Sequence, residues 1–312
     1  MTGTTHLGPC PTLWGSKGIA TAWRDARDLL VRAQPPAVQL HTWEPARVAD
    51  GVRRDIPGVR IVVGVGIDGI ARDVATGQLS VDRGAAQMVM LARRAVDAGA
   101  EVIVWNAEAG WKRPPSHPER ARIVSLVREG LAAVAGILPP IAQWHTAYDH
   151  PSFHSTYPWE AWLGPGSPVL ASLPQVYAAP GDDVMAHRGA LPAREARALA
   201  SWASAVRAGW IRPDAPEGSV GDLTDVDWHP YYQAHHVPTR DTVAAAVGRP
   251  TVCLWAYPTR SDEDGRRALL VLCELRRRGH WTRDGVRTFQ REAGLVADGA
   301  VGPKTLAALG LS

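Results

Sequence analysis

Eight short apolar runs alternate with helix-length segments along the first 264 residues of this chain. Most of the runs are apolar almost throughout, which is typical of strands buried on both faces of a parallel sheet. Eight strand–helix units of this total length fit a TIM-type barrel. We therefore expect an α/β fold in which residues 1–264 form a (β/α)8 barrel. The expected strands are 13–15, 37–41, 60–65, 101–105, 140–144, 169–173, 227–232 and 251–255.

The segments between these runs have the length and pattern of helices. The clearest are 20–33, 81–98, 118–135, 192–208 and 239–247, with Gly99 and Gly136 placed where helix C-caps are wanted. A doubly wound open sheet would show the same alternation and is our second expectation. No glycine-rich phosphate loop follows the first run, which disfavours a nucleotide-binding version of that fold.

The last part of the chain, residues 265–312, has a different pattern. Val286 and Phe289 lie three residues apart on one helical face, and Gly294 is placed to end that helix in the left-handed conformation. Asp298 and Gly299 form a turn, and Pro303 fits the first turn of a further short helix. The pattern predicts a small all-α module at the C-terminus.

This tail resembles the second half of the three-helix peptidoglycan-binding domain found on many bacterial cell-wall hydrolases. The resemblance implies that the chain is delivered to bacterial cell wall, and it places wall contacts at Trp281, Phe289, Gln290 and Asp298. The segment before the second helix is shorter than is usual in the family. The matching residues are Val286, Phe289, Gln290, Gly294, Leu295, Asp298, Gly299, Val301, Gly302, Thr305 and Leu309.

Polar and aromatic residues gather where the expected strands end. In a barrel these ends form the mouth that carries the site. The chain has 13 tryptophans, and many follow a strand. Aromatic rings stack on the apolar faces of sugars, so we expect a saccharide cleft. The expected substrate-binding residues are Trp43, Glu44, Asn106, Trp111, Trp144, His145, Gln175, Tyr177, Tyr231, Trp255 and Tyr257.

Glu108 is the expected general acid of this cleft. It follows the fourth strand directly, and glycosidic cleavage needs a proton donor against the leaving oxygen. Asp68, which follows the neighbouring third strand, is the expected second carboxylate. An alternative is that the acetamido group of the substrate supplies the nucleophile, with Asn106 orienting that group.

A barrel with an acidic residue ending its fourth strand, joined to a wall-binding module, is similar to the lysozyme-type muramidases of glycoside hydrolase family 25. Two departures stand out: Asn106 occupies the place of the first carboxylate of the Asp-x-Glu signature, and residues 14–17 contain no Asp. The resemblance implies a peptidoglycan hydrolase that cleaves the glycan backbone, as the endolysins of bacteriophages do.

Two other functions stay open. A zinc-dependent amidase or peptidase would need three converging ligands, and His145, His150 and His154 follow the fifth strand. A non-catalytic cell-wall-binding or virion structural protein would explain the missing Asp of the signature. We expect no metal and no cofactor.

Charge and the N-terminal sequence limit the partners. The net charge of +3 is too weak to indicate nucleic acid, and no apolar run is long enough to insert in a membrane. Residues 1–10 have neither the basic start nor the apolar stretch of a signal peptide. We therefore expect a monomer that stays in the host cytoplasm until it is released to the wall, or that is associated with the virion.

Overall fold

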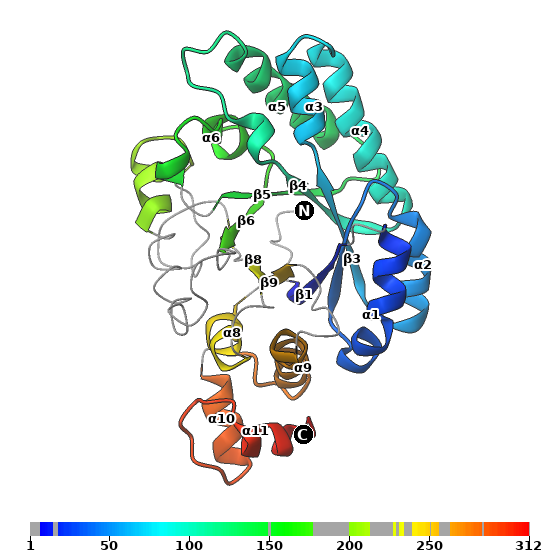
Figure 1. The fold of residues 1–312 in the computed structure, drawn as a ribbon, viewed down its shortest axis with the longest axis vertical. Coiled ribbons are helices and arrows are strands. Elements are labelled where there is room, and N and C mark those ends of the chain that lie inside the picture. Colours follow the sequence, from blue (N-terminus) through cyan, green and yellow to red (C-terminus); the bar gives the residue numbers. More distant parts are fainter. Residues whose placement is uncertain are drawn as a thin grey trace.

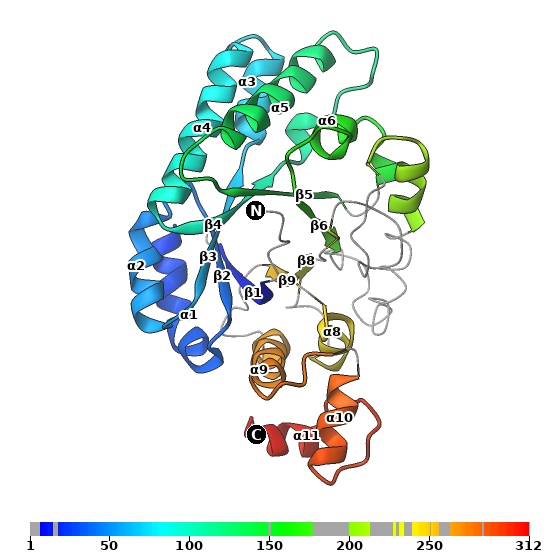
Figure 2. The ribbon, with the colours of Figure 1, turned by 180° about the vertical axis from the view of Figure 1, so that it is seen from behind.

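The structure is a computed structural model that describes residues 7–14, 18–148, 151–176, 200–212, 227–228, 231–233, 239–249, 251–255, 263–282 and 284–311. Parallel strands lie at the centre, and helices surround them on the outside (Figure 1). The small C-terminal helices lie beyond this layer, at one end of the molecule, as Figure 2 shows from behind.

The strands pair in a closed circuit. β1 to β6 pair in chain order, β6 pairs with both β7 and β8, β8 pairs with β9, and β9 pairs with β1, every pair being parallel. The fold is therefore mixed α/β and TIM-like, and the β1–β9 pairing contradicts an open sheet. The strands are β1 (Gly8–Leu13), β2 (Ala37–His41), β3 (Arg60–Gly66), β4 (Ala100–Asn106), β5 (Ala142–Tyr148), β6 (Ala171–Val176), β7 (Asp227–Trp228), β8 (Tyr231–Gln233) and β9 (Thr251–Trp255).

Most strands are followed in the sequence by a helix. The expected helix 192–208 is described only from residue 200 onward, where it is helical to residue 207. Two short 3-10 helices are η1 (Ala109–Trp111) and η2 (Pro151–His154). The α-helices are α1 (Ile19–Ala33), α2 (Ala46–Asp55), α3 (Asp68–Ala75), α4 (Val81–Asp97), α5 (Arg120–Ala135), α6 (Trp159–Leu163), α8 (Thr239–Ala246), α9 (Glu263–Arg277), α10 (Gly285–Glu292) and α11 (Pro303–Leu309).

Several local predictions differ from the structure. The strands expected at 140–144 and 169–173 lie further along the chain, as β5 and β6. The first strand was expected at 13–15, but β1 spans Gly8–Leu13. Pro9 and Pro11 have no backbone N–H to donate to a neighbouring strand, so their segment does not look like a strand from sequence. Gly99 has the left-handed φ of a C-cap, +69°, whereas Gly136 stays in the right-handed region with φ −88°. The turn after α5 therefore does not need glycine for its backbone.

Side chains alternate between the inside of the barrel and the helical layer. On β4, Val102 and Val104 belong to the cluster inside the barrel, whereas Ile103 and Trp105 belong to the cluster under the helices. This period of two is the geometry of any strand. Asn106 continues the inward series of β4, so the end of this strand delivers a polar side chain to the mouth.

Helix α9 serves both parts of the chain. It packs against β1, α1 and α8, and its Cys273 is buried. It also carries α10 and α11, which pack on it and lie below it in Figure 1. The boundary expected between 264 and 265 therefore falls within the first turn of a helix that covers the barrel. Among the described helices, none is long and apolar enough to cross a membrane.

The C-terminal module is held at the end of the barrel where the strands begin. The guanidinium of Arg276 lies against Gly8, the first residue of β1. The indole N–H of Trp281 donates to the backbone oxygen of Arg249, just before β9 (2.8 Å). Since the strands are parallel, their polar C-terminal ends lie at the opposite end of the barrel. The module and the mouth therefore face different ends of the molecule.

Candidate functional site at the barrel mouth

Four of the predicted residues meet at the end of β4. The backbone N–H of Glu108 donates to Oδ1 of Asp68 (2.8 Å). Nε2 of Gln175 donates to Oε1 of Glu108 (2.8 Å) and to Oδ1 of Asn106 (3.2 Å). The strands β3, β4 and β6 thus bring Asp68, Asn106, Glu108 and Gln175 together in one hydrogen-bonded group, which we call the mouth site.

The local sequence explains how Glu108 comes to lie beside Asp68. β4 ends at Asn106, and the chain turns at once into η1. A side chain at Gly110 would place its Cβ 2.6 Å from the backbone oxygen of Asp68. Only glycine allows η1 to approach the first turn of α3 so closely. The Glu-x-Gly spacing therefore fixes the position of the carboxylate.

Lys112 and Tyr148 border the mouth site, and the sequence analysis did not single them out. Nζ of Lys112 lies 3.8 Å from the ring centroid of Tyr148, a cation–π contact. Burial lowers the pKa of Lys112, and the charge of Glu108 opposes that shift. Burial, then Glu108 and then Asp68 raise the pKa of Tyr148, so its hydroxyl remains a hydrogen-bond donor. Tyr148 lies two residues after Thr146 and therefore on the same face of β5. This spacing could have identified Tyr148 from the sequence.

A second polar group lies inside the barrel near the end of β2, and it was also missed. The hydroxyl of Thr12 donates to Oε1 of Gln39 (3.3 Å). A Cβ at Gly64 would lie 2.4 Å from Nε2 of Gln39 and 2.8 Å from Nδ1 of His41, so this glycine makes room for both side chains. Burial lowers the pKa of His41 to about 4, which keeps the ring neutral. Gln39 and His41 are two residues apart on β2, so their side chains share one face of the strand. This spacing of polar residues in an apolar strand is the sequence signal for the polar group.

His145 does not reach the mouth, contrary to prediction. Its ring lies in the outer layer, where Nε2 is 2.7 Å from the hydroxyl of Tyr157 and Nδ1 is 3.4 Å from Oγ of Ser172. Complete burial lowers its pKa to about 3. The reason is alternation along β5, because Trp144 points into the barrel and its neighbour must then point outward.

The expected tryptophans of the cleft also lie elsewhere. Trp144 is fully buried inside the barrel, and Trp111 is fully buried against Trp162, with ring centroids 5.2 Å apart. Neither ring can stack on a sugar in this structure. Tyr177 and Tyr257 lie outside the described residues, and for Tyr231 and Trp255 only the strand backbone is described.

His145 is not available as a zinc ligand, which argues against the zinc alternative. Both ring nitrogens of His145 lie within hydrogen-bonding distance of Tyr157 and Ser172, and the ring is enclosed. The ring of His154 stacks on Tyr148 with centroids 3.9 Å apart, and His150 lies outside the described residues. Within the described part of the chain, no three His, Cys, Asp or Glu side chains are grouped so that they could hold a metal.

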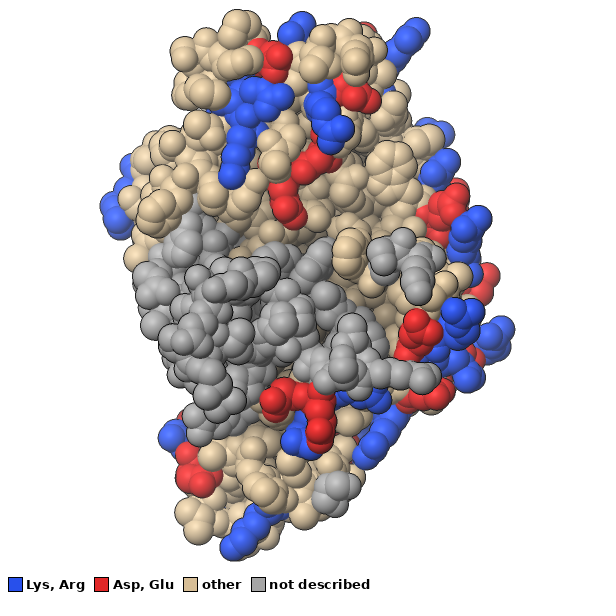
Figure 3. All heavy atoms as spheres, in the orientation of Figure 1, with Lys and Arg blue, Asp and Glu red and all other residues tan. Residues whose placement is uncertain are grey.

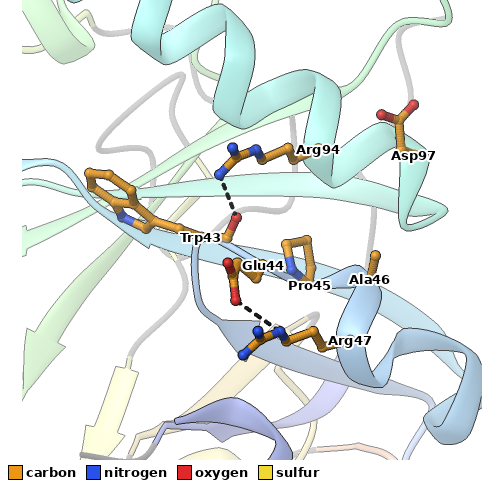
Figure 4. Close-up of a pocket in the computed structure, with 7 residues that line it drawn as sticks. All are labelled: Trp43, Glu44, Pro45, Ala46, Arg47, Arg94 and Asp97. Carbon is orange, nitrogen blue, oxygen red and sulfur yellow. Dashed lines mark hydrogen bonds and ion pairs between the residues drawn. The ribbon is translucent and has the colours of Figure 1, made fainter.

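Trp43 and Glu44 lie beside the barrel and line a pocket there (Figure 4). The indole N–H of Trp43 donates to the backbone oxygen of Gly66 (3.0 Å), and the residue is 43% exposed. The carboxylate of Glu44 pairs with Arg47 (3.0 Å). Glu44 therefore belongs to an outer pocket rather than to the hydrogen-bonded group around Glu108.

In the C-terminal module, Gln290 holds the turn together. Its Nε2 donates to Oδ1 of Asp298 (2.8 Å), to the backbone oxygen of Ala300 (2.9 Å) and to Oγ1 of Thr305 (3.1 Å). Its Oε1 accepts from the backbone N–H of Gly299 (2.8 Å). Gln290 is only 2% exposed and Phe289 4%, so both are internal supports and not wall contacts.

The other two wall-contact candidates remain accessible in part. Asp298 is exposed, and its pKa is lowered by the backbone N–H of Ala300 and by Gln290. Trp281 is half-buried, because its indole docks on Arg249 of the barrel.

Acidic and basic side chains are interspersed over α1, α2 and α4, along the right edge of Figure 3. This edge is therefore a mixed solvated face and carries no single-sign patch.

The family comparison matches the tail. Residues 277–309 match the family described as "Putative peptidoglycan binding domain". The match covers α10, α11 and the end of α9, the part in which Gln290 is buried. A comparison with curated proteins finds no match. The module is thus similar to a peptidoglycan-binding family.

Two solved structures are similar to much of the chain. A xylose isomerase domain protein from Planctomyces limnophilus is 17% identical with a TM-score of 0.36, and the similarity covers 62% of this chain and 69% of that protein. Endonuclease IV from Thermus thermophilus is 17% identical with a TM-score of 0.42, and the similarity covers 85% of this chain and 97% of that protein. These scores are low.

The prediction of a glycan-cleaving hydrolase is wrong. The similar solved structures are named as a xylose isomerase domain protein and an endonuclease IV, and neither name describes a glycosidase of the cell wall. Peptidoglycan binding by the tail does not by itself make a hydrolase, and no finding supports the resemblance to glycoside hydrolase family 25 or to endolysins. The strand pairing shows a TIM-like α/β domain, and the family comparison adds that residues 277–309 are similar to a peptidoglycan-binding domain.

Proposed function

We propose that this protein is a peptidoglycan-binding protein whose C-terminal module holds the α/β domain at the bacterial cell wall. The observation that carries the proposal is the family match at residues 277–309. The contacts of Gln290 support it, since a buried amide that satisfies Asp298, Gly299, Ala300 and Thr305 gives the module a defined shape.

The mouth site is proposed to bind a polar ligand of the wall, rich in hydroxyl and amide groups. Among the described residues, the carboxylate of Glu108 accepts from the side chain of Gln175 on Oε1 only, and that of Asp68 accepts from the backbone N–H of Glu108 on Oδ1 only. The second oxygen of each carboxylate can accept from a ligand hydroxyl or amide. Lys112 and the hydroxyl of Tyr148 supply donors beside them. Such convergent polar groups at a barrel mouth are typical of ligand sites.

Sedimentation with purified sacculi tests the role of the module. Replacing Gln290 by Ala leaves several backbone and side-chain groups without their partner, at about 1–3 kcal/mol for each buried group. We expect Gln290→Ala to lose binding to sacculi while the barrel stays folded. The matched control is Arg291→Ala, an exposed neighbour on the same helix. Full binding by a Gln290→Ala protein whose module has demonstrably unfolded would refute the proposal.

The mouth site has its own test. Glu108→Gln keeps the shape of the side chain and can still accept from Gln175, but it removes the charge. We expect this variant to bind soluble glycan fragments of the wall roughly tenfold more weakly in calorimetry, since a hydrogen bond to a charged group is worth about 1.5–3 kcal/mol. Glu129→Gln, an exposed change on α5, is the control. Equal affinity of all three proteins would remove the mouth site from the proposal.

A further inference from the structure

Two glycines on the inward face of β3 adjoin the mouth site. Gly64 pairs with His41 of β2, and Gly66 pairs with Asn106 of β4. The strands β2, β3 and β4 lie side by side (Figure 2). Because neither glycine carries a side chain, polar side chains of β2 can lean across β3 toward Asn106, which belongs to the mouth site.

The ring of His41 occupies this space. A Cβ at Gly64 would lie 2.8 Å from Nδ1 of His41, and a Cβ at Gly66 would lie 3.9 Å from Nε2. Since Gly66 is the last residue of β3, Nδ1 is on the inner side of the ring and Nε2 is on the side of the mouth. Burial lowers the pKa of His41 to about 4, so near neutral pH the ring has one N–H and one acceptor nitrogen. The position of that proton decides whether the mouth receives a donor or an acceptor.

The amide of Gln39 lies against the inner side of this ring. A Cβ at Gly64 would overlap Nε2 of Gln39 as well as approach Nδ1 of His41. The other end of the amide is held, because Oε1 accepts from the hydroxyl of Thr12 (3.3 Å). Gln39 is fully buried, and among the described residues its Nε2 has no hydrogen-bonding partner. A buried N–H is costly unless an acceptor satisfies it, and an unprotonated Nδ1 beside it is such an acceptor.

We propose that Gln39 is a positioning residue for His41. Its amide donates to Nδ1 of His41, by a direct hydrogen bond or through one bridging water, and so keeps the ring proton on Nε2. His41 then presents an N–H donor to the mouth, across Gly66 from Asn106. Resting on the proposed function, the ligand is a wall fragment that offers an acceptor oxygen to His41 and a hydroxyl or amide donor to Glu108.

Nitrogen NMR of histidine-labelled protein near neutral pH tests the positioning role, because protonated and unprotonated ring nitrogens give separate signals. His41→Phe identifies the His41 signals by their loss. We expect the parent protein to carry the proton on Nε2. Gln39→Glu puts an acceptor-only carboxylate in place of the donor and should move a proton to Nδ1. Gln39→Met removes every hydrogen-bonding group and should give a mixture of the two tautomers.

Gln143→Met is the matched control for these variants. Gln143 is also a buried glutamine on a strand, but it bonds to Trp105 and Leu131, outside the polar group around Gln39. This variant should leave the His41 signals unchanged. If Gln39→Glu does not fold, the Gln39→Met protein alone decides the result.

Calorimetry with soluble glycan fragments of the wall tests the donor at the mouth. His41→Phe keeps an aromatic ring but removes the N–H, and we expect roughly tenfold weaker binding than that of the parent. Gln39→Glu should weaken binding to a similar degree, although Gln39 is buried away from the ligand.

Three outcomes would overturn the inference: a proton on Nδ1 in the parent, an unchanged tautomer in a folded Gln39 variant, or parent affinity in His41→Phe. The NMR measurement needs no ligand. If the parent binds no glycan fragment, the proposed function of the mouth site fails, and the NMR result still decides the role of Gln39. Weakened binding by Glu108→Gln together with full binding by His41→Phe rejects this inference alone.

Discussion

The backbone N–H of Glu108 donates a 2.8 Å hydrogen bond to Oδ1 of Asp68, and this bond joins the end of β4 to the first turn of α3. Asp68 was predicted as a second catalytic carboxylate, and the structure shows that it also positions the segment that carries Glu108. Because of this bond, the stability of the protein should depend on the acceptor oxygen of Asp68 rather than on its charge.

Asp68→Ala and Asp68→Asn should therefore differ. Asn can still accept from the N–H of Glu108, whereas Ala leaves that group without its partner. We expect Asp68→Ala to lower the free energy of unfolding by about 1.5 kcal/mol and Asp68→Asn by clearly less. Urea unfolding of the two variants measures the difference. Equal losses would show that the charge of Asp68, and not its acceptor oxygen, matters.

Gly64 should tolerate no side chain. A Cβ at this position would lie 2.4 Å from Nε2 of Gln39, within a closed barrel wall. We expect Gly64→Ala to destabilise the protein by about 1–3 kcal/mol, the usual cost of overpacking. Gly69→Ala is the control, because nothing lies within 4 Å of its Cβ in α3, and it should stabilise the helix by about 0.5 kcal/mol. Thermal unfolding checks both signs.

The buried histidines should make the protein sensitive to mild acid. Burial lowers the pKa of His145 from 6.5 to about 3 and that of His41 to about 4. The unfolded chain therefore binds protons first as the pH falls below 6.5, so stability is lost from there downward. The slope is about 1 kcal/mol per pH unit for each histidine. Urea midpoints for His145→Gln should change less between about pH 7 and pH 5 than those of the parent protein, and an identical pH dependence would contradict this account.

Truncation should distinguish α9 from the rest of the module. Removing residues 280–312 keeps α9 over β1 and α1, so the barrel should still unfold cooperatively although at lower stability. Removing residues 263–312 also exposes the apolar surface that Leu269, Leu272 and Cys273 cover, and should prevent stable folding. Circular dichroism and denaturant unfolding report the result. A shorter chain that unfolds like the longer one would show that α9 is not part of the barrel.

The sequence by itself located most strands and helices, because strands buried on both faces need continuous apolar runs and helices between them need their own period. It also located the tail, where Gly294, Asp298 and Gly299 act through local backbone geometry. At the mouth it placed Asp68, Asn106, Glu108 and Gln175 at strand ends, and the structure joins these four in one hydrogen-bonded group, since parallel strands bring their ends to one edge.

The tertiary structure decided what each of these residues faces. His145 and Trp144 are neighbours, yet one lies under the helices and the other inside the barrel, because strand register alone sets the side on which each residue falls. Trp43 and Glu44 end a strand as expected but line an outer pocket with α4, a helix distant in sequence. Helix α9 packs on β1 from the other end of the chain. Such long-range packing depends on how the whole barrel closes, and no local pattern records it.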